Sequence, residues 1–379
     1  MNIEAEQTAI QMLIHVTDEG DVLLLHVGIE PYQQGMIAPY QLQAFRLVEV
    51  QAAGMDQDEH HGSKHTGTLP GKCLRYEAHT WTEDADSRLL TIVQSGAGVR
   101  VRSHLRLYRT IPAIRSFTEV ENMSAKPITL TYVSSFALTG LCKEGMLPWD
   151  EKAFVWIPSN SWGGEAQWRR NPIRALGMTR VEGISTVKDP QCMQNFSMKR
   201  IQWLANGTWG SGEYLPMGSV ENAETGEVLT WQIEHHAAWH AEISDTLGQL
   251  YLRLSGPTDQ ENQWAKTLLP HERFCSVPCC ITVGQSFSDT ISTLTAYRRL
   301  IRRDHWDNHT LPVVFNDYMN CLYGDPTTEK LLPLIDAAAH VGCEVFCIDC
   351  GWYADGPWWD GVGQWLPSQK RFPNGIEEP

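Results

Sequence analysis

The longer first part of this sequence alternates between short strand patterns and turns, and no helical stretch of comparable length interrupts it. This feature constrains the fold more than any other. Apolar and β-branched residues gather at positions 21–27, 89–93, 99–108, 128–136, 227–235 and 250–254. Turn signals such as Asn206-Gly207 and Ser255-Gly256-Pro257 separate these runs. Many antiparallel strands without crossover helices are typical of a sandwich, so we predict a large β-domain over residues 1–286.

The pattern changes near Phe287. Ser288 and Asp289 are residue types that cap helices, and the apolar residues from Ile291 to Ile301 follow at helical spacing. We expect a linker helix within residues 287–310.

After residue 310 the sequence has the pattern of a parallel α/β unit. Residues 311–316 form a short apolar run, residues 327–340 an amphipathic helix pattern, and residues 344–349 a second apolar run. Strand, helix and strand in this order predict a right-handed parallel βαβ unit. A closed (β/α)8 TIM barrel needs ~250 residues, so residues 311–379 hold only its first two βα units. The predicted fold class is therefore multidomain, β plus α/β, with a β-sandwich followed by an incomplete barrel.

Both predicted strands of this unit become polar at their carboxyl ends, where barrel enzymes carry their functional residues. Residues 316–318 read Asn-Asp-Tyr, and residues 349–352 read Asp-Cys-Gly-Trp. A carboxylate that ends an apolar run needs hydrogen-bond partners, and sugar hydroxyls would serve. The simpler alternative is that Asp349 caps the following loop. That loop is rich in tryptophan and tyrosine, which suits the apolar face of a sugar ring or a protein-contact surface.

A specific resemblance rests on two segments near the end of the chain, LPVVFNDYMNCLYGDPTTEKLLPLIDAAAHVGCEVFCIDCGWY and VGQWLPSQKRFPNGI. They are similar to the opening of the catalytic barrel in glycoside hydrolase family 36. That family carries an Asn-Asn-Trp-like element on its first strand and Asp-Asp-Gly-Trp on its second. Upstream, residues 114–133, 231–243 and 250–274 resemble the family's β-supersandwich. The resemblance implies an α-galactosidase, a hydrolase of carbohydrate metabolism, with the β-supersandwich at residues 1–286.

The resemblance also implies substrate-binding residues. Asp349 matches a residue that binds galactose hydroxyls, and Asn316 and Tyr318 align with the first-strand element. Trp352 and Trp365 fall on tryptophans of the family, and Trp365 is the expected contact with the sugar.

Several positions depart from the family pattern. Tyr318 replaces a sugar-contacting tryptophan, and Asp317 replaces an asparagine. Gln364 replaces an aspartate, and Cys350 stands where a second hydroxyl-binding aspartate is usual. The family uses that aspartate pair to recognise the axial hydroxyl, so the change at Cys350 weakens the assignment to galactose.

The family's retaining mechanism uses two carboxylates, which the resemblance places beyond residue 379. Asp336, on the predicted helix, and Glu344, at the start of a strand, are at the wrong end of a barrel to replace them. We expect the complete family member to hydrolyse terminal α-galactosides such as melibiose or raffinose by double displacement, and this chain alone to be inactive. A non-catalytic carbohydrate-binding fragment, α-N-acetylgalactosaminidase activity and galactosyl transfer stay open, as does whether the stop at 379 is natural.

Charge and hydropathy argue against nucleic-acid-binding, membrane-spanning and secreted classes of protein. The formal net charge of −15 argues against nucleic-acid binding, because phosphates would be repelled. No apolar run is long enough to span a bilayer, and the start of the chain lacks the pattern of a signal peptide. We expect a cytoplasmic protein that binds a small oligosaccharide, with no cofactor, nucleic acid or membrane partner. Members of the family commonly assemble, which leaves a homo-oligomer open.

A redox or zinc role for the Cys-x-x-Cys pattern at Cys347 and Cys350 is not expected. A redox pair needs its first cysteine at the amino end of a helix, whereas Cys347 lies inside a predicted buried strand. No second pair supplies four zinc ligands.

Two groups of histidines raise the question of a metal site. His236 and His240 have the spacing of neighbours on a helix, with glutamates beside them, but the segment reads as strands around a turn. Residues 59–65 contain His60, His61 and His65 in a loop rich in glycine and charge. By analogy with the family such a loop could face a neighbouring subunit, but a solvated loop is the expectation. The sequence therefore predicts no metal site.

Overall fold

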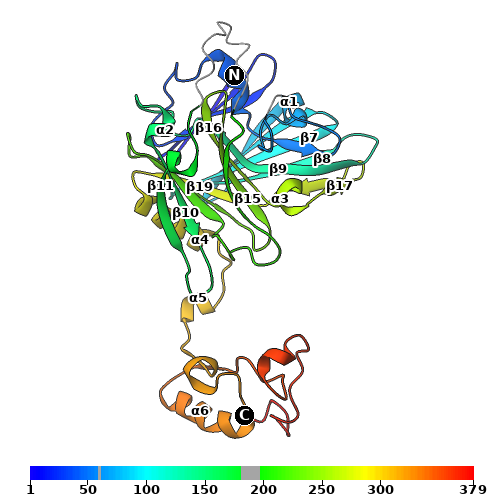
Figure 1. Ribbon diagram of the computed structural model, residues 1–379, viewed down its shortest axis with the longest axis vertical. Helices are drawn as coiled ribbons and strands as arrows, with labels where there is room; N and C mark the ends of the chain where they lie inside the picture. Colours follow the sequence, from blue (N-terminus) through cyan, green and yellow to red (C-terminus); the bar gives the residue numbers. More distant parts are fainter. Residues whose placement is uncertain (59–60, 181–196) are drawn as a thin grey trace. The chain divides into compact units, whose positions relative to one another are not determined.

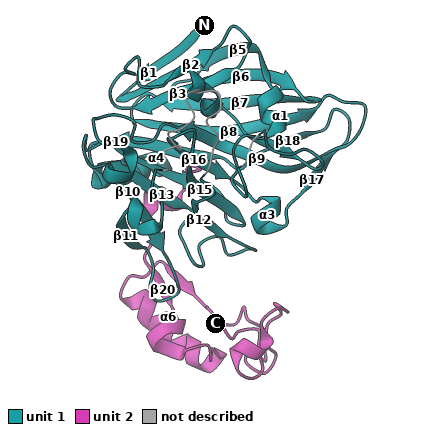
Figure 2. Cartoon of the chain, turned by 45° about the horizontal axis from the view of Figure 1, so that its top comes forward, with its two compact units in different colours: residues 1–301 teal, residues 302–379 magenta. Residues whose placement is uncertain are grey.

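The computed structural model describes residues 1–58, 61–180 and 197–379, which form two compact units. Residues 1–301 make up the first unit and residues 302–379 the second (Figure 2). The first contains antiparallel sheets and the second a parallel strand pair with a helix, so the predicted fold class of β plus α/β is confirmed. The domain limits predicted at 286 and 310 stay predictions.

The described residues of the first unit form three antiparallel sheets, whose strands Figure 1 shows. The small sheet consists of β1 (Asn2–Gln7), β2 (Ile10–Val16) and β3 (Val22–Gly28). The ten-stranded sheet consists, in spatial order, of β11 (Gln167–Pro172), β10 (Ala153–Ser159), β13 (Met217–Asn222), β14 (Val228–Ile233), β19 (Cys279–Gly284), β8 (Ala113–Asn122), β7 (Val99–Tyr108), β6 (Ser87–Gly96) and β5 (Arg75–Glu83), with β18 (Arg273–Cys275) paired to β8. The six-stranded sheet consists of β12 (Arg200–Ala205), β15 (Trp239–Thr246), β16 (Gln249–Ser255), β9 (Ile128–Thr139) and β17 (Lys266–Leu268), with β4 (Val50–Ala52) paired to β9.

Alternation of apolar and polar residues explains why the strands form sheets with one buried face. In β7, Val99, Val101, Leu105 and Leu107 are buried, whereas the arginines between them are half-exposed. Successive side chains of a strand point to opposite faces, so this pattern packs one face into the core. The six strand patterns predicted from the sequence all correspond to observed strands.

Helices are few in the described part of the first unit. They are α1 (Leu69–Cys73), α2 (Trp149–Lys152), α3 (Asp259–Asn262), α4 (Phe287–Ile301) and the short turns η1 (Pro39–Phe45) and η2 (Ile173–Leu176). The predicted helix after Phe287 is α4. It packs against β14 and β19, and its residues Leu294 and Tyr297 are fully buried.

The second unit contains the predicted βαβ pattern. It consists of α5 (Asp307–Thr310), β20 (Val314–Asn316), the irregular turn η4 (Tyr318–Leu322), α6 (Thr328–His340), β21 (Val345–Cys347) and η5 (Trp358–Gly361). Strands β20 and β21 are parallel, as predicted. Thr327 caps α6, because its side chain accepts a hydrogen bond from the backbone of Lys330.

One sequence prediction for the first unit is wrong. His61 and His65 are 3% and 5% exposed and Lys64 is fully buried, so the described part of the stretch 59–65 is not a solvated loop. The reason is long-range packing on β15: Lys64 Nζ donates to the backbone oxygen of Asp245 at 2.7 Å. Glu59 and His60 lie outside the described residues. None of the described helices is long and apolar enough to cross a membrane.

Candidate functional site

The parallel pairing of β20 and β21 brings the two polar strand ends together. Asn316, the last residue of β20, lies opposite Cys347, the last residue of β21. Asp349 follows two residues later, and Asn316 Nδ2 donates a hydrogen bond to Asp349 Oδ2 at 2.7 Å. The two polar strand ends predicted from the sequence are therefore in direct contact.

Asp317 lies beneath this pair and is 1% exposed. Its Oδ1 accepts a hydrogen bond from the backbone N–H of Asp349 at 2.8 Å, while its Oδ2 has no partner among the described residues. Burial, followed by the nearby charge of Asp349, raises the pKa of Asp317. The side chain of Asp317 thus fixes the end of β21 from within, a role that the sequence did not indicate.

Hydrogen bonds keep the Asp349 carboxylate ionised. The Cys350 thiol donates to Oδ1 at 2.9 Å and Asn316 donates to Oδ2, and these two bonds lower the pKa of Asp349. Each carboxylate oxygen can accept a further hydrogen bond. Asp349 is therefore suited to accept from hydroxyl groups of a neutral ligand.

Cys350 is a thiol rather than a thiolate in this position. Burial, followed by the hydrogen bond to Asp349, raises the pKa of Cys350 to about 11. A thiol with a raised pKa is a poor nucleophile and metal ligand, which argues against a redox role for Cys347 and Cys350.

Tyr318 belongs to one of two aromatic groups near the strand ends. Its backbone N–H donates to Asn316 Oδ1 at 2.8 Å, and its ring stacks on that of Tyr323 at 5.1 Å. Trp358 packs edge-on against Tyr318 at 5.7 Å. Tyr318 therefore holds the Asn316 amide in the orientation that donates to Asp349.

Trp365 belongs to the second aromatic group and is 56% exposed. Its ring packs edge-on against Tyr353 at 4.7 Å and is tilted on Trp352 at 6.2 Å. Trp352 is half-buried and supports the exposed ring. A supported, exposed indole presents a flat apolar face, which suits a sugar ring.

Two features that sequence reasoning missed hold the loops of the site in place. A Cβ at Gly351, whose φ is +95°, would lie 2.1 Å from the backbone oxygen of Gly324, so only glycine allows the two loops to meet. Arg371, which is 8% exposed, donates to the backbone oxygen of Gly356 at 2.8 Å and pairs with Asp325. The segment KRFPNG was a sequence signal, but it gave no role to the arginine.

The other carboxylates considered from the sequence lie away from this site. Asp336 is an exposed residue of α6, and Glu344 immediately precedes β21, at the opposite end of the strand from Asp349. The described arrangement can therefore bind hydroxyl groups through Asn316 and Asp349 and stack an apolar ring face on Trp365.

Comparisons with known proteins agree with this description. Residues 283–378 match the family model described as Melibiase. The alpha-galactosidase Mel36A of Lactobacillus acidophilus is 22% identical over 310 residues, which cover 79% of this chain and 37% of that protein. Alpha-galactosidase 1 of Pediococcus pentosaceus is 32% identical over 89 residues, which cover 21% of this chain and 12% of that protein.

Solved structures extend the likeness to almost the whole chain. A variant of the alpha-galactosidase AgaA from Geobacillus stearothermophilus, in complex with stachyose, has a TM-score of 0.76 at 15% identity and covers 99% of this chain and 54% of its own. The alpha-galactosidase of Lactobacillus brevis has a TM-score of 0.73 at 14% identity, with 99% and 52% coverage. This chain thus spans about half the length of these solved relatives. The predicted resemblance to glycoside hydrolase family 36 is confirmed.

Proposed function

We propose that the polar strand ends of this chain bind the terminal galactose of an α-galactoside. The premise is that the chain has the architecture of the family 36 glycoside hydrolases. The observation that carries the proposal is the hydrogen bond between Asn316 and Asp349. The exposed ring of Trp365, which packs on Trp352 and Tyr353 in the segment after Asp349, offers an apolar platform. A fixed donor, an ionised acceptor and an apolar platform are the groups that a monosaccharide needs.

The relatives support the substrate class and the reaction of the whole protein. The curated matches are alpha-galactosidases, and AgaA structures hold stachyose or raffinose. We propose hydrolysis of melibiose- or raffinose-type galactosides by retaining double displacement, in which two carboxylates ~5–5.5 Å apart act as nucleophile and acid/base. The cytoplasmic location and the homo-oligomer stay predictions.

The described carboxylates at the strand ends cannot supply both of these catalytic roles. The general acid must hold a proton near neutral pH, whereas hydrogen bonds lower the pKa of Asp349. Asp317 is buried beneath the strand ends and bonded to the backbone, so it cannot reach a sugar. This observation favours a second candidate function for the present residues, in which they bind the galactoside without cleaving it.

Two measurements on the purified chain test the proposal. The first is release of the aryl group from an aryl α-galactoside, where we expect no turnover. The second is quenching of tryptophan fluorescence by galactose, glucose and N-acetylgalactosamine, where we expect saturation by galactose at concentrations at which glucose has no effect. Turnover would overturn the assignment of a binding role without cleavage, and equal quenching by glucose would overturn galactose recognition. Equal quenching by N-acetylgalactosamine would extend the substrate class to that sugar.

A further inference from the structure

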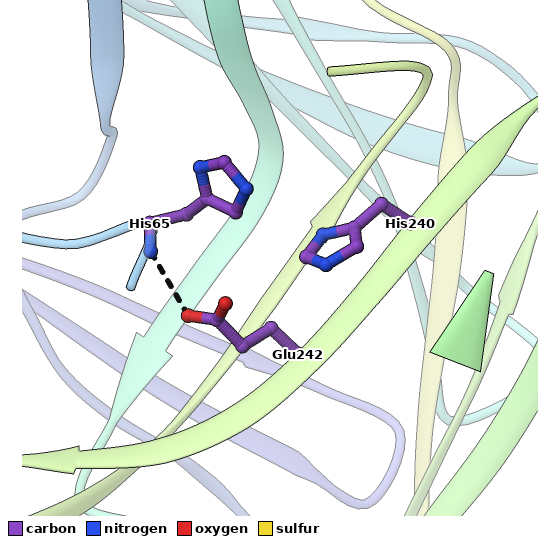
Figure 3. A group of neighbouring side chains, drawn as sticks. All are labelled: His65, His240 and Glu242. Atoms are coloured by element: carbon purple, nitrogen blue, oxygen red, sulfur yellow. Dashed lines mark hydrogen bonds between the residues drawn. The ribbon is translucent and has the colours of Figure 1, made fainter. Parts of the chain in front are cut away.

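A second cluster of polar side chains lies inside the first unit. His240 and Glu242 are two residues apart on β15, so they share one face of the strand. His65 approaches them from the segment that packs on β15, and Figure 3 shows the three side chains as neighbours, with the Glu242 carboxylate at the backbone nitrogen of His65. One nitrogen or oxygen atom from each of the three lies within 4.8 Å of the others, and the residues are 5%, 0% and 0% exposed in chain order.

One atom of this cluster is a buried acceptor without a donor. His240 Nε2 lies 3.1 Å from Oε1 of Gln202, and an amide oxygen only accepts, so Nε2 carries the hydrogen and Nδ1 has the free lone pair. Nδ1 has no hydrogen-bond partner among the described residues. The His65 ring lies edge-on at 4.9 Å. A buried lone pair without a partner is unfavourable, whereas an imidazole nitrogen is the commonest metal ligand.

The other two side chains are held in place by their neighbours. Glu242 Oε1 accepts from the Tyr251 hydroxyl at 2.7 Å and from the backbone N–H of His65 at 3.0 Å. The His65 ring stacks on Tyr132 at 4.2 Å, and its Nε2 lies 2.9 Å from Glu261 Oε2. Such outer partners fix the orientation of ligand side chains in metal sites.

Among the described residues, the balance of charges around this cluster depends on His65. With His65 neutral, as a metal ligand must be, four buried or partly buried carboxylates face three side-chain cations, which leaves one negative charge in excess: Glu49, Glu242, Asp245 and Glu261 against Lys64, Arg200 and Arg253. A protonated His65, which pairs with Glu261, would balance the charges without an ion. Arg200 Nη1 lies 3.1 Å from Glu242 Oε2 and 2.8 Å from Glu261 Oε1, so it occupies one oxygen of each carboxylate. Buried charges need compensation, and a bound cation would supply it.

We propose that His65, His240 and Glu242 bind a divalent transition-metal ion such as Zn²⁺. Two imidazoles and a carboxylate are a ligand set that zinc accepts, and structural zinc sites have four ligands in tetrahedral geometry. A water molecule would take the fourth position, as in zinc sites with three protein ligands. The ion would fasten the segment around His65 to β15, far in sequence from it.

The test is metal content, measured by mass spectrometry on the full chain purified without a histidine tag and dialysed against Zn²⁺ and then against metal-free buffer. We expect about one zinc ion per chain in the wild type, and a thermal midpoint that falls with a chelator and recovers with Zn²⁺. His240→Gln removes the free nitrogen and should abolish retention. His104→Gln is the matched control, because His104 is partly buried against Phe117 outside the cluster, and it should retain the ion.

Two results would overturn the proposal. The first is a folded wild-type chain that retains no zinc and melts identically with and without the chelator. The second is retention by His240→Gln equal to that of the wild type. If His240→Gln fails to fold, the wild-type metal content and the chelator effect decide alone.

Discussion

Asp349 carries its charge because Cys350 and Asn316 both donate to it. At position 350 the family usually has a second aspartate. The Cys350 thiol affects the pKa of Asp349 in the opposite direction. A second carboxylate would raise the pKa of Asp349 by repulsion, whereas the Cys350 thiol lowers it. The departure from the family pattern therefore keeps Asp349 ionised to lower pH while it removes one acceptor group.

The pH dependence of galactose binding follows from this lowered pKa. Binding needs the ionised carboxylate, so affinity should stay constant from pH 8 to about 5 and fall only below the usual aspartate pKa of ~3.9. In Cys350→Ala, which loses the larger of the two lowering effects, the fall should begin at higher pH. Fluorescence titrations with galactose at a series of pH values measure the affinity profile of the wild type and that of the variant. An identical profile in the variant would show that the thiol has no influence on Asp349.

Trp365 is expected to provide the stacking surface for the sugar. Trp365→Ala should weaken binding about five- to tenfold, from the loss of ~1 kcal/mol of aromatic contact. Trp359→Ala is the matched control, because Trp359 is also exposed (69%) and packs on Trp358 rather than in the Trp365 group. Affinities from calorimetry distinguish the two, and an equal effect of both variants would contradict a specific role for Trp365.

At the level of residues, prediction from the sequence succeeded where a polar residue follows an apolar run. Asn316 and Asp349 follow apolar runs directly, so the strand pattern alone places them at one edge. The structural roles of Asp317, Arg371 and His65 were not predicted, because they depend on contacts with residues distant in the sequence. The helical spacing of His236 and His240 was correctly set aside, because the segment forms strands, but the shared strand face of His240 and Glu242 was not predicted.

At the level of elements, the sequence located the strands well and their ends less well. The predicted strand at 311–316 begins only at Val314, because Leu311 has a left-handed backbone (φ +49°) after α5. The predicted strand at 344–349 is limited to Val345–Cys347. Alternation determines which face of a strand is buried, but it contains no information on where pairing with the neighbour stops.

The contact between the loops after β20 and β21 should depend on Gly351. Gly351→Ala would place a methyl group 2.1 Å from the Gly324 backbone oxygen at a φ of +95°, so the loops must separate and galactose binding should fall at least tenfold. Gly356→Ala is the control, because no atom lies within 4 Å of the added Cβ. Near-ultraviolet circular dichroism of the tryptophans reports the rearrangement. Normal binding by Gly351→Ala would contradict the described loop contact.

At the level of the whole molecule, the two units differ in how much apolar surface they bury. Strands of the first unit pack into an extensive core, in which Trp231, Trp239 and Ile243 are fully buried. In the second unit Val314 and Val345, on the two parallel strands, are 53% and 40% exposed. Local opening costs less free energy where few apolar contacts are lost.

Hydrogen exchange should therefore separate the two units. We expect amides of β20, α6 and β21 to exchange at least tenfold faster than those of β7, β8 and β16 in the same chain. Mass spectrometry of peptides after exchange measures this directly, and the strands of the first unit serve as the internal control. Protection after residue 310 equal to that of the sandwich would contradict the account of an open parallel sheet.

We expect Asn316 and Asp349 to bind one galactose residue together. Calorimetric titration of melibiose into the wild-type chain and into Asp349→Asn tests it most directly, since the variant keeps the shape and loses the charge. The account predicts saturable binding by the wild type and about tenfold or greater weakening in the variant, as expected for loss of a charge-assisted hydrogen bond worth ~1.5–3 kcal/mol. Absence of binding by a folded wild type, or equal affinity in both proteins, would contradict it.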